Sequence, residues 1–138
     1  DENNNLLYGK IYNWYAAANA NNICPAGWHL PSDAEWTTLS NTLGGSYSAG
    51  GKMKSTGTQF WTNINTDATN SSGFSALPGG MRDVDGNFQD INNYAAWWSS
   101  SMVSFYYKWY RYINKFYSDL KRGTMNNPAG YSIRCLKN

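Results

Sequence analysis

The chain has 138 residues, of which 41% are hydrophobic, 17% aromatic and 14% charged, with a formal net charge of +2. This length suits one domain with a buried core. A small positive charge without any run of Lys or Arg argues against a nucleic-acid partner, because phosphate binding needs clustered cations. No segment is apolar for long enough to span a membrane and no signal peptide is recognisable, so any export signal is expected to lie outside this sequence.

The composition combines seven Trp and eleven Tyr with few charged residues. Ordinary domains contain about 25% Asp, Glu, Lys and Arg, so this surface must present Asn, Ser, Thr, Gly and Tyr instead. Diversified binding surfaces use the same mixture, because rigid rings supply contact area while small polar groups adapt. An extracellular β-rich domain with an uncharged polar surface is the alternative, since strands and turns favour the same residues.

In chain order, residues 1–5 are predicted to be a disordered leader that precedes a single domain over residues 6–138. Residues 6–13 contain the Leu, Ile and Tyr typical of a first strand. Residues 14–22 are rich in Ala and Asn and are predicted to form a short helix.

A capping box predicts the start of a second helix. Ser32 can accept from the amide of Glu35, while the Glu35 carboxylate reaches back to the amide of Ser32. Gly44 and Gly45 are expected to end this helix.

The middle of the chain is predicted to be irregular. Residues 46–72 are rich in Gly, Ser, Thr and Asn, and we expect long loops there. Isolated apolar residues should anchor these loops: Met53, Phe60, Trp61 and Ile64. Residues 73–77 are predicted to be a short strand, and residues 83–87 (DVDGN) a hairpin turn, with a weak calcium site as the alternative.

The C-terminal part is predicted to supply three strands, over residues 94–100, 107–114 and 130–136. The expected fold class is therefore α+β, with two N-terminal helices, a mostly antiparallel C-terminal sheet and long loops. Twelve of the twenty-three aromatic residues lie between Tyr94 and Tyr131. Alternate residues of a strand point to opposite faces, so one face can form the scaffold while the other meets a ligand.

The alternation assigns residues to these two faces. The scaffold face is predicted to hold Trp109, Arg111, Ile113, Leu120 and Arg122. The opposite face would present Tyr110, Tyr112, Asn114, Asp119, Lys121 and Gly123. A core composed of Tyr would need a buried partner for every hydroxyl, which favours exposure of Tyr110 and Tyr112.

Cys24 and Cys135 are too far apart in sequence for the compact pairs of a zinc site. One long-range disulfide is the simplest use of them, and two buried free thiols are the alternative. A bridge closing a loop of about 110 residues would stabilise the domain by about 4 to 5 kcal/mol and would indicate an oxidising compartment.

Catalytic constellations are not recognisable. His29 is the single histidine and lies in a turn-like segment, so we expect a structural side chain. Capping and the helix dipole account for Asp33 and Glu35 without acid or base chemistry. No phosphate-binding glycine motif is present. We therefore expect no enzyme activity, no metal and no cofactor.

Several blocks of sequence carry a family resemblance. They occupy residues 24–36 (CPAGWHLPSDAEW), 44–45, 49–54 (AGGKMK), 73–82 (GFSALPGGMR), 97–100 (WWSS) and 130–135 (GYSIRC). Their order and spacing closely resemble the Fibrobacter succinogenes major paralogous domain, from about Gly9 to Lys137. The resemblance implies a C-type lectin-like fold in which Cys24 and Cys135 form a disulfide. Domains of this family also look like targets of diversity-generating retroelements, which would place a variable stretch at about residues 97–135.

The resemblance also implies that residues of that stretch fall into scaffold positions and ligand-facing positions. Scaffold positions would be Trp97, Trp98, Ser99, Ser100, Trp109, Arg111, Ile113, Leu120, Arg122, Gly130, Ser132, Arg134 and Cys135. Diversified, ligand-facing positions would be Met102, Phe105, Tyr107, Tyr110, Tyr112, Asn114, Phe116, Tyr117, Asp119, Lys121, Gly123 and Met125.

The expected function is a non-enzymatic binding module that presents an aromatic and basic surface to a protein or other macromolecular ligand. It would be a monomeric domain of a larger secreted or cell-surface chain, such as an adhesin or pilus tip or a phage receptor-binding protein. A carbohydrate-binding module is the first alternative. An enzyme related to the formylglycine-generating fold, which the family's fold also resembles, is the second.

Overall fold

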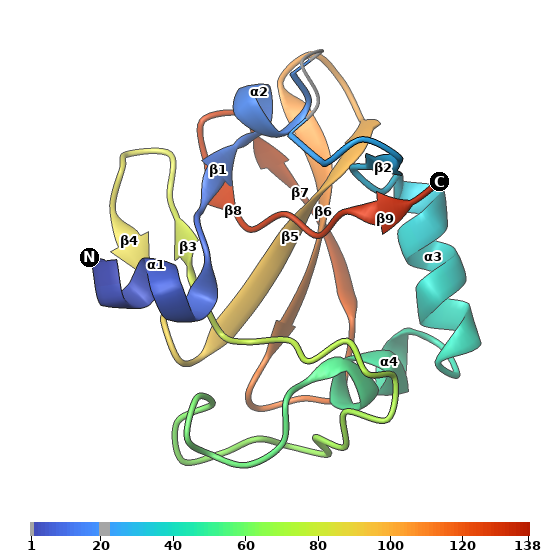
Figure 1. Ribbon diagram of the computed structural model, residues 1–138, viewed down its shortest axis with the longest axis vertical. Helices are drawn as coiled ribbons and strands as arrows, with labels where there is room; N and C mark the ends of the chain where they lie inside the picture. The colour runs from blue at the N-terminus through green and yellow to red at the C-terminus, as the bar shows by residue number, and fades with distance from the viewer. Residues whose placement is uncertain (1, 20–22) are drawn as a thin grey trace.

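The computed structural model describes residues 2–19 and 23–138 (Figure 1). The fold class predicted from the sequence, α+β with antiparallel sheets, is confirmed. In chain order the elements are α1 (Glu2–Tyr8), β1 (Tyr12–Asn13), α2 (Trp14–Ala17), β2 (Trp28–His29), α3 (Asp33–Thr42), α4 (Ser46–Met53), β3 (Met81–Arg82), β4 (Phe88–Gln89), β5 (Tyr94–Met102), β6 (Tyr107–Asn114), β7 (Lys121–Asn126), β8 (Gly130–Tyr131) and β9 (Leu136–Lys137).

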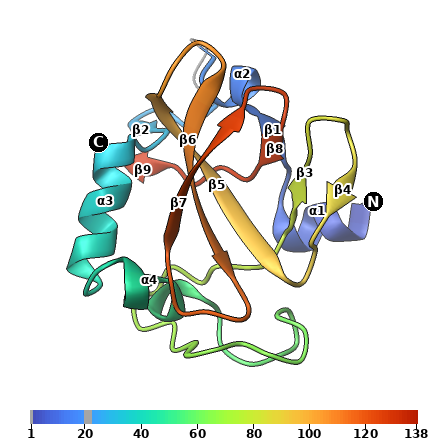
Figure 2. The same ribbon diagram turned by 180° about the vertical axis from the view of Figure 1, so that it is seen from behind.

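The longest strands form an antiparallel sheet in the order β5-β6-β7, which occupies the middle of the molecule (Figures 1 and 2). Helices α3 and α4 lie on one side of it, and β1 and β8 on the other. Smaller sheets have the orders β1-β8-β3-β4 and β2-β9. The sequence predicted β5 and β6 closely but not β7, and its single strand over residues 130–136 is divided into β8 and β9.

Both faces of the central sheet are buried. Trp97 and Ile113 face α3 and α4 in one apolar cluster with Trp36. Trp98 and Tyr110 face the other way, in a second cluster with Tyr131. Burial on both faces explains why β5 contains four consecutive apolar residues rather than an alternating pattern.

The predicted disulfide is confirmed: Cys24 and Cys135 are bonded across a separation of 111 residues. Close to it, β2 pairs with β9, so that His29 lies opposite Leu136. The C-terminal segment is thereby fastened to the chain just before α3. No helix in the described part of the chain is long and apolar enough to cross a membrane.

The capping box at the start of α3 is confirmed. Ser32 Oγ accepts from the Glu35 amide at 3.2 Å, and Glu35 Oε2 accepts from the Ser32 amide at 2.8 Å. Two orphan amides of the first turn are therefore satisfied. The helix ends before Gly44 and Gly45, both of which have positive φ.

The prediction of a continuous loop from residue 46 is wrong, because residues 46–53 form α4. Gly50 and Gly51 are poor helix formers, but close approach requires them. A Cβ on Gly50 would collide with the carbonyl group of Asp119, and one on Gly51 would lie 2.6 Å from the Asp67 oxygen. Tertiary packing therefore overrides the local preference.

The long segment after α4 is irregular, as predicted, and is anchored from within. Trp61 is fully buried, although Ile64 is exposed. The buried Lys54 ammonium donates to the carbonyl oxygens of Thr66 at 2.7 Å and Tyr117 at 2.9 Å. Burial lowers the pKa of Lys54 to about 8. Residues 73–77 form no strand and contribute only an isolated bridge between Ala76 and Lys54.

The N-terminal predictions need correction. Residues 2–5, predicted to be disordered, belong to α1, where Glu2 lies favourably in the first turn. Gly9, with a φ of 78°, follows this helix, so the strand predicted over residues 6–13 shrinks to β1. The helix predicted over residues 14–22 is confirmed only as α2; its last three residues, 20–22, and Asp1 of the leader lie outside the described residues.

The predicted turn at residues 83–87 is confirmed as the connection of the β3–β4 hairpin. One Asp83 oxygen accepts from the amides of Asp85 and Asn87, at 3.0 and 2.9 Å. The hydrogen bond from the Asn87 amide is the main cause that lowers the pKa of Asp83. The carboxylate thus stabilises the turn.

Candidate functional site

The twelve residues predicted to face a ligand do not share one surface. Met102, Phe105 and Tyr107 lie at the β5–β6 connection. Phe116, Tyr117 and Asp119 lie in the β6–β7 connection, at the opposite end of the sheet. The register of β6 and β7 gives the remaining six the face that Tyr110 occupies: Tyr110, Tyr112, Asn114, Lys121, Gly123 and Met125. Because β6 spans eight residues, the two ends are about 26 Å apart.

The β5–β6 connection, residues 102–107, presents a cluster of exposed rings, which we call the aromatic hairpin. Phe105 is 73% exposed and Tyr106 is 67% exposed. Met102, Val103 and Tyr107 are also exposed. The sequence predicted three of these residues and missed Val103 and Tyr106, because strand alternation gives no rule for the residues of a turn.

The backbone of the aromatic hairpin is fixed from below by a lysine. The amides of Val103 and Ser104 donate to the Tyr107 carbonyl oxygen. Lys108, only 2% exposed, donates through Nζ to the carbonyl oxygens of Ser104 at 2.9 Å and Phe105 at 3.1 Å.

Two further side chains complete this support. The Lys108 ammonium lies 4.3 Å from the centroid of the Trp14 ring. Asn127, also buried, donates to the Phe105 carbonyl oxygen at 3.1 Å. The hairpin therefore holds its carbonyl groups inward and its rings outward. Lys108 lies two residues before Tyr110 in β6 and therefore on the same buried face of the sheet.

The predicted exposure of Tyr110 and Tyr112 is wrong. Tyr110 is only 9% exposed and stacks on Tyr131 with ring centroids 4.5 Å apart. Tyr112 is half-buried and stacks on Tyr110 and Tyr94, at 5.5 and 5.2 Å. Burial, and then the neighbouring Tyr110, raise the pKa of Tyr131. The alternation separated the two faces correctly, but a downstream segment covers the second face.

Gly123 supports this tyrosine row rather than a ligand. It lies opposite Tyr110 in the β6–β7 register. A Cβ at this position would lie 2.7 Å from the Tyr110 ring. The ring cannot turn aside freely, because Tyr112 and Tyr131 stack on it. Met125, on the same face, packs against the second apolar cluster.

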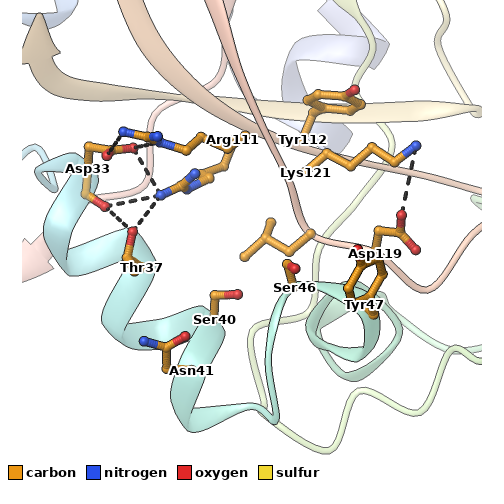
Figure 3. A pocket seen from close by; sticks show the side chains of 12 residues that line it. Asp33, Thr37, Ser40, Asn41, Ser46, Tyr47, Arg111, Tyr112, Asp119 and Lys121 are labelled. Atoms are coloured by element: carbon orange, nitrogen blue, oxygen red, sulfur yellow. Dashed lines mark hydrogen bonds and ion pairs between the residues drawn. The ribbon is translucent and has the colours of Figure 1, made fainter.

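A polar cavity of about 620 Å³ lies between α3, the start of α4 and the β6–β7 strands (Figure 3). At one end the Asp33 carboxylate pairs with Arg111 at 2.9 Å and with Arg122 at 2.6 Å. The Arg122 guanidinium also lies 3.4 Å from the centroid of the Trp109 ring. These contacts hold β7 against the start of α3, a use of Asp33 that its position in the helix alone did not predict.

The rest of the cavity is lined by hydroxyl, amide and charged groups. Figure 3 shows Ser40 and Asn41 on α3, and Tyr47 and Lys121 across from them. Lys121 lies 3.8 Å from the carboxylate of Asp119.

His29 has a structural environment. Its Nδ1 lies 2.6 Å from Asn138 Oδ1, and its Nε2 lies 2.9 Å from Glu35 Oε1. The hydrogen bond to Asn138 and then that to Glu35 raise the pKa of His29, because both oxygens accept from the protonated ring. Within residues 2–19 and 23–138, no three His, Cys, Asp or Glu side chains form a group that could hold a metal ion.

These features define a disulfide-stapled α+β domain that presents a supported aromatic hairpin. Over residues 1–137 the sequence matches the model of the Fibrobacter succinogenes major domain, and the chain belongs to that family. No curated protein and no solved structure matches it.

Proposed function

We propose that this domain is a non-enzymatic binding module that holds a protein or other macromolecular ligand through the aromatic hairpin. The observation that carries the proposal is the exposure of Phe105 and Tyr106 on a backbone whose carbonyl groups Lys108 and Asn127 satisfy. Clustered exposed apolar side chains mark interaction surfaces, and aromatic residues dominate the binding energy of many interfaces.

The support beneath the hairpin favours binding because it reduces the ordering cost. A loop that must become ordered on binding loses conformational entropy, whereas a loop already held by its own hydrogen bonds loses little. Tyr and Phe side chains add large contact area with only two rotatable bonds each. The hairpin thus resembles a binding loop presented by a rigid scaffold.

The finer parts of the proposal concern fold type, location and variation. The disulfide supports export into an oxidising environment, as part of a larger cell-surface or phage chain such as an adhesin. A C-type lectin-like fold and diversification by a retroelement, which the sequence resemblance implies, belong to the same proposal. The hairpin tolerates side-chain variation on this proposal, because its support comes from backbone carbonyl groups rather than from its own rings.

A carbohydrate is the second candidate ligand, and the polar cavity favours it. Hydroxyl and amide groups of Thr37, Ser40 and Asn41 line one wall, and the highly exposed Tyr47 ring lies across from them. Such groups can donate to and accept from sugar hydroxyls. This candidate uses a different surface, so the two proposals are separable by mutation.

The test compares matched variants at the two ends of the sheet. Phe105→Ser with Tyr106→Ser removes the hairpin rings, and Phe116→Ser with Tyr117→Ser removes rings that are 53% and 54% exposed at the far end. Wild type and both variants are screened against a panel of cell-surface proteins and a glycan array.

We expect the hairpin variant to lose a protein ligand at least about tenfold in Kd, with an unchanged melting temperature, while the control binds like wild type. Equal binding by both variants would contradict the proposal. Glycan binding that depends on Tyr47 would favour the second candidate.

A further inference from the structure

The central sheet has one open edge, which is β7. On the β5 side, Gly80 bridges Ala95 and Ser132 bridges Trp97. On the other side, β7 pairs with β6 and with no further strand in the described part of the chain. An open edge presents unpaired amide and carbonyl groups to any extended segment that can reach them.

The hydrogen-bond phase identifies which groups of β7 point outward. Lys115 donates to the Asn93 carbonyl oxygen, one residue beyond the pair of Tyr94 with Asn114. Since hydrogen-bonded and non-hydrogen-bonded pairs alternate, odd residues of β6 bond to β5 and even residues bond to β7. Tyr110 therefore bonds to Gly123, and the intervening residues of β7 turn their backbone groups outward.

The chain itself closes both ends of this edge. The Leu120 amide donates to the Ser46 carbonyl oxygen at 2.7 Å, and the Asn126 carbonyl oxygen accepts from the Ala129 amide at 3.1 Å. Between them, the outward amide and carbonyl groups of Arg122 and Thr124 have no backbone partner among the described residues. These four groups match the spacing of one added strand.

The surroundings of the edge favour an acidic segment. The polar cavity runs beside the start of β7, and its lining includes the cations Arg111, Lys121 and Arg122 but only the acids Asp33 and Asp119. One positive charge is therefore left uncompensated there.

A second copy of this chain is a poor occupant of the same edge. In the antiparallel register that joins the outward groups of Arg122 and Thr124 in both copies, the two Arg122 side chains would be diagonal neighbours on one face, and like charges on neighbouring strands repel.

We propose that β7 accepts an extended acidic segment of a protein partner as an added, fourth strand. Backbone bonds to Arg122 and Thr124 would supply affinity, and the side chains would supply specificity. The partner residue opposite Arg122 is acidic, because opposite charges on neighbouring strands attract.

This inference does not depend on the aromatic hairpin. It uses backbone groups of β7, whereas the proposed function uses side chains of residues 102–107. Either can fail while the other stands.

The test is a selection of random decapeptides displayed on phage against the folded domain, counter-selected against Thr124→Pro. Proline removes the outward amide of residue 124 and leaves the bonds to β6 in place, since proline is tolerated where an edge amide faces solvent. Thr124→Ala is the matched control. Circular dichroism and melting establish that each variant is folded.

We expect extended peptides with acidic residues at alternate positions, with Kd raised at least about tenfold by Thr124→Pro and unchanged by Thr124→Ala. N-methylation of alternate peptide amides should abolish binding in one phase and spare it in the other. The methylation result stands even if the proline variant fails to fold. Selected peptides that bind both variants equally and tolerate methylation in either phase would overturn the proposal, as would a selection that yields no peptide.

Discussion

Replacing Lys108 by Met tests whether the buried Lys108 ammonium keeps the aromatic hairpin ordered. Met keeps much of the length and apolar character of the lysine side chain but removes the ammonium. Three contacts are lost: the hydrogen bonds to the carbonyl oxygens of Ser104 and Phe105, and the contact with the Trp14 ring.

The expected cost follows from these contacts. Hydrogen bonds from a charged donor contribute about 1.5 to 3 kcal/mol each, and a cation beside an aromatic ring about 0.5 to 2 kcal/mol. Two effects oppose this loss. The variant no longer buries an ammonium group, and water can reach the exposed carbonyl groups once the hairpin loosens. We therefore expect the free energy of unfolding to fall by about 2 kcal/mol.

Urea unfolding measures this change, and native-state hydrogen exchange locates it. The amides of Val103 and Ser104, which donate to Tyr107, should exchange at least about tenfold faster in the variant. Lys121→Met is the matched control, because the Lys121 ammonium is partly exposed and its nearest carboxylate oxygen is 3.8 Å away. The control should cost less than about 0.5 kcal/mol.

Unchanged hydrogen exchange in the hairpin would contradict this role of Lys108. If Lys108→Met leaves exchange at Val103 and Ser104 unchanged while stability falls, the ammonium stabilises the core and not the hairpin. Ligand binding should then survive the substitution.

Three further predictions concern the scaffold. Replacing Cys24 and Cys135 by Ser should lower the free energy of unfolding by about 2 to 5 kcal/mol in urea titration, and a smaller loss would contradict the staple. The raised pKa of His29 means that its stabilising effect is complete below its unfolded pKa of about 6.5 and is lost as pH rises through the folded pKa. His29→Gln should make the urea midpoint less dependent on pH across that window. An unchanged pH dependence would show that the hydrogen bonds of His29 do not contribute to stability. Gly123→Ala should lower the free energy of unfolding by about 1 to 3 kcal/mol, because the added methyl group displaces the Tyr110 ring. In a double-mutant cycle, Tyr110→Leu should relieve part of that cost. If the two changes in the free energy of unfolding simply add, the clash is excluded.

Features with a local cause were predictable from the sequence. The capping box needs only residues 32–35, and its geometry follows from the side chains themselves. The bounds of β6 follow from its aromatic and β-branched content. The bond between Cys24 and Cys135 agrees with the simplest use of the two cysteines in the sequence.

Features that depend on distant segments were not predictable in the same way. Helix α4 contains two glycines, which are required because the backbones of residues 67 and 119 lie too close for a side chain. Tyr110 is buried because Tyr131 and Trp98 cover it. One signal did exist in the sequence: the apolar run from Ala95 to Trp98 is typical of a strand that is buried on both faces.

The burial of both faces changes where variation is tolerable. Truncating a buried aromatic residue such as Tyr110 would cost about 3 to 5 kcal/mol, a large share of the roughly 5 to 15 kcal/mol that stabilises a typical domain. Substituting the exposed Phe105 or Tyr106 should change stability by no more than about 0.5 kcal/mol. On the proposed function, scaffold and specificity are therefore separated along the strands, between their middles and their ends, and not across the two faces of the sheet. A binding surface that varies at the aromatic hairpin can change while the tyrosine row, Gly123 and the disulfide stay fixed.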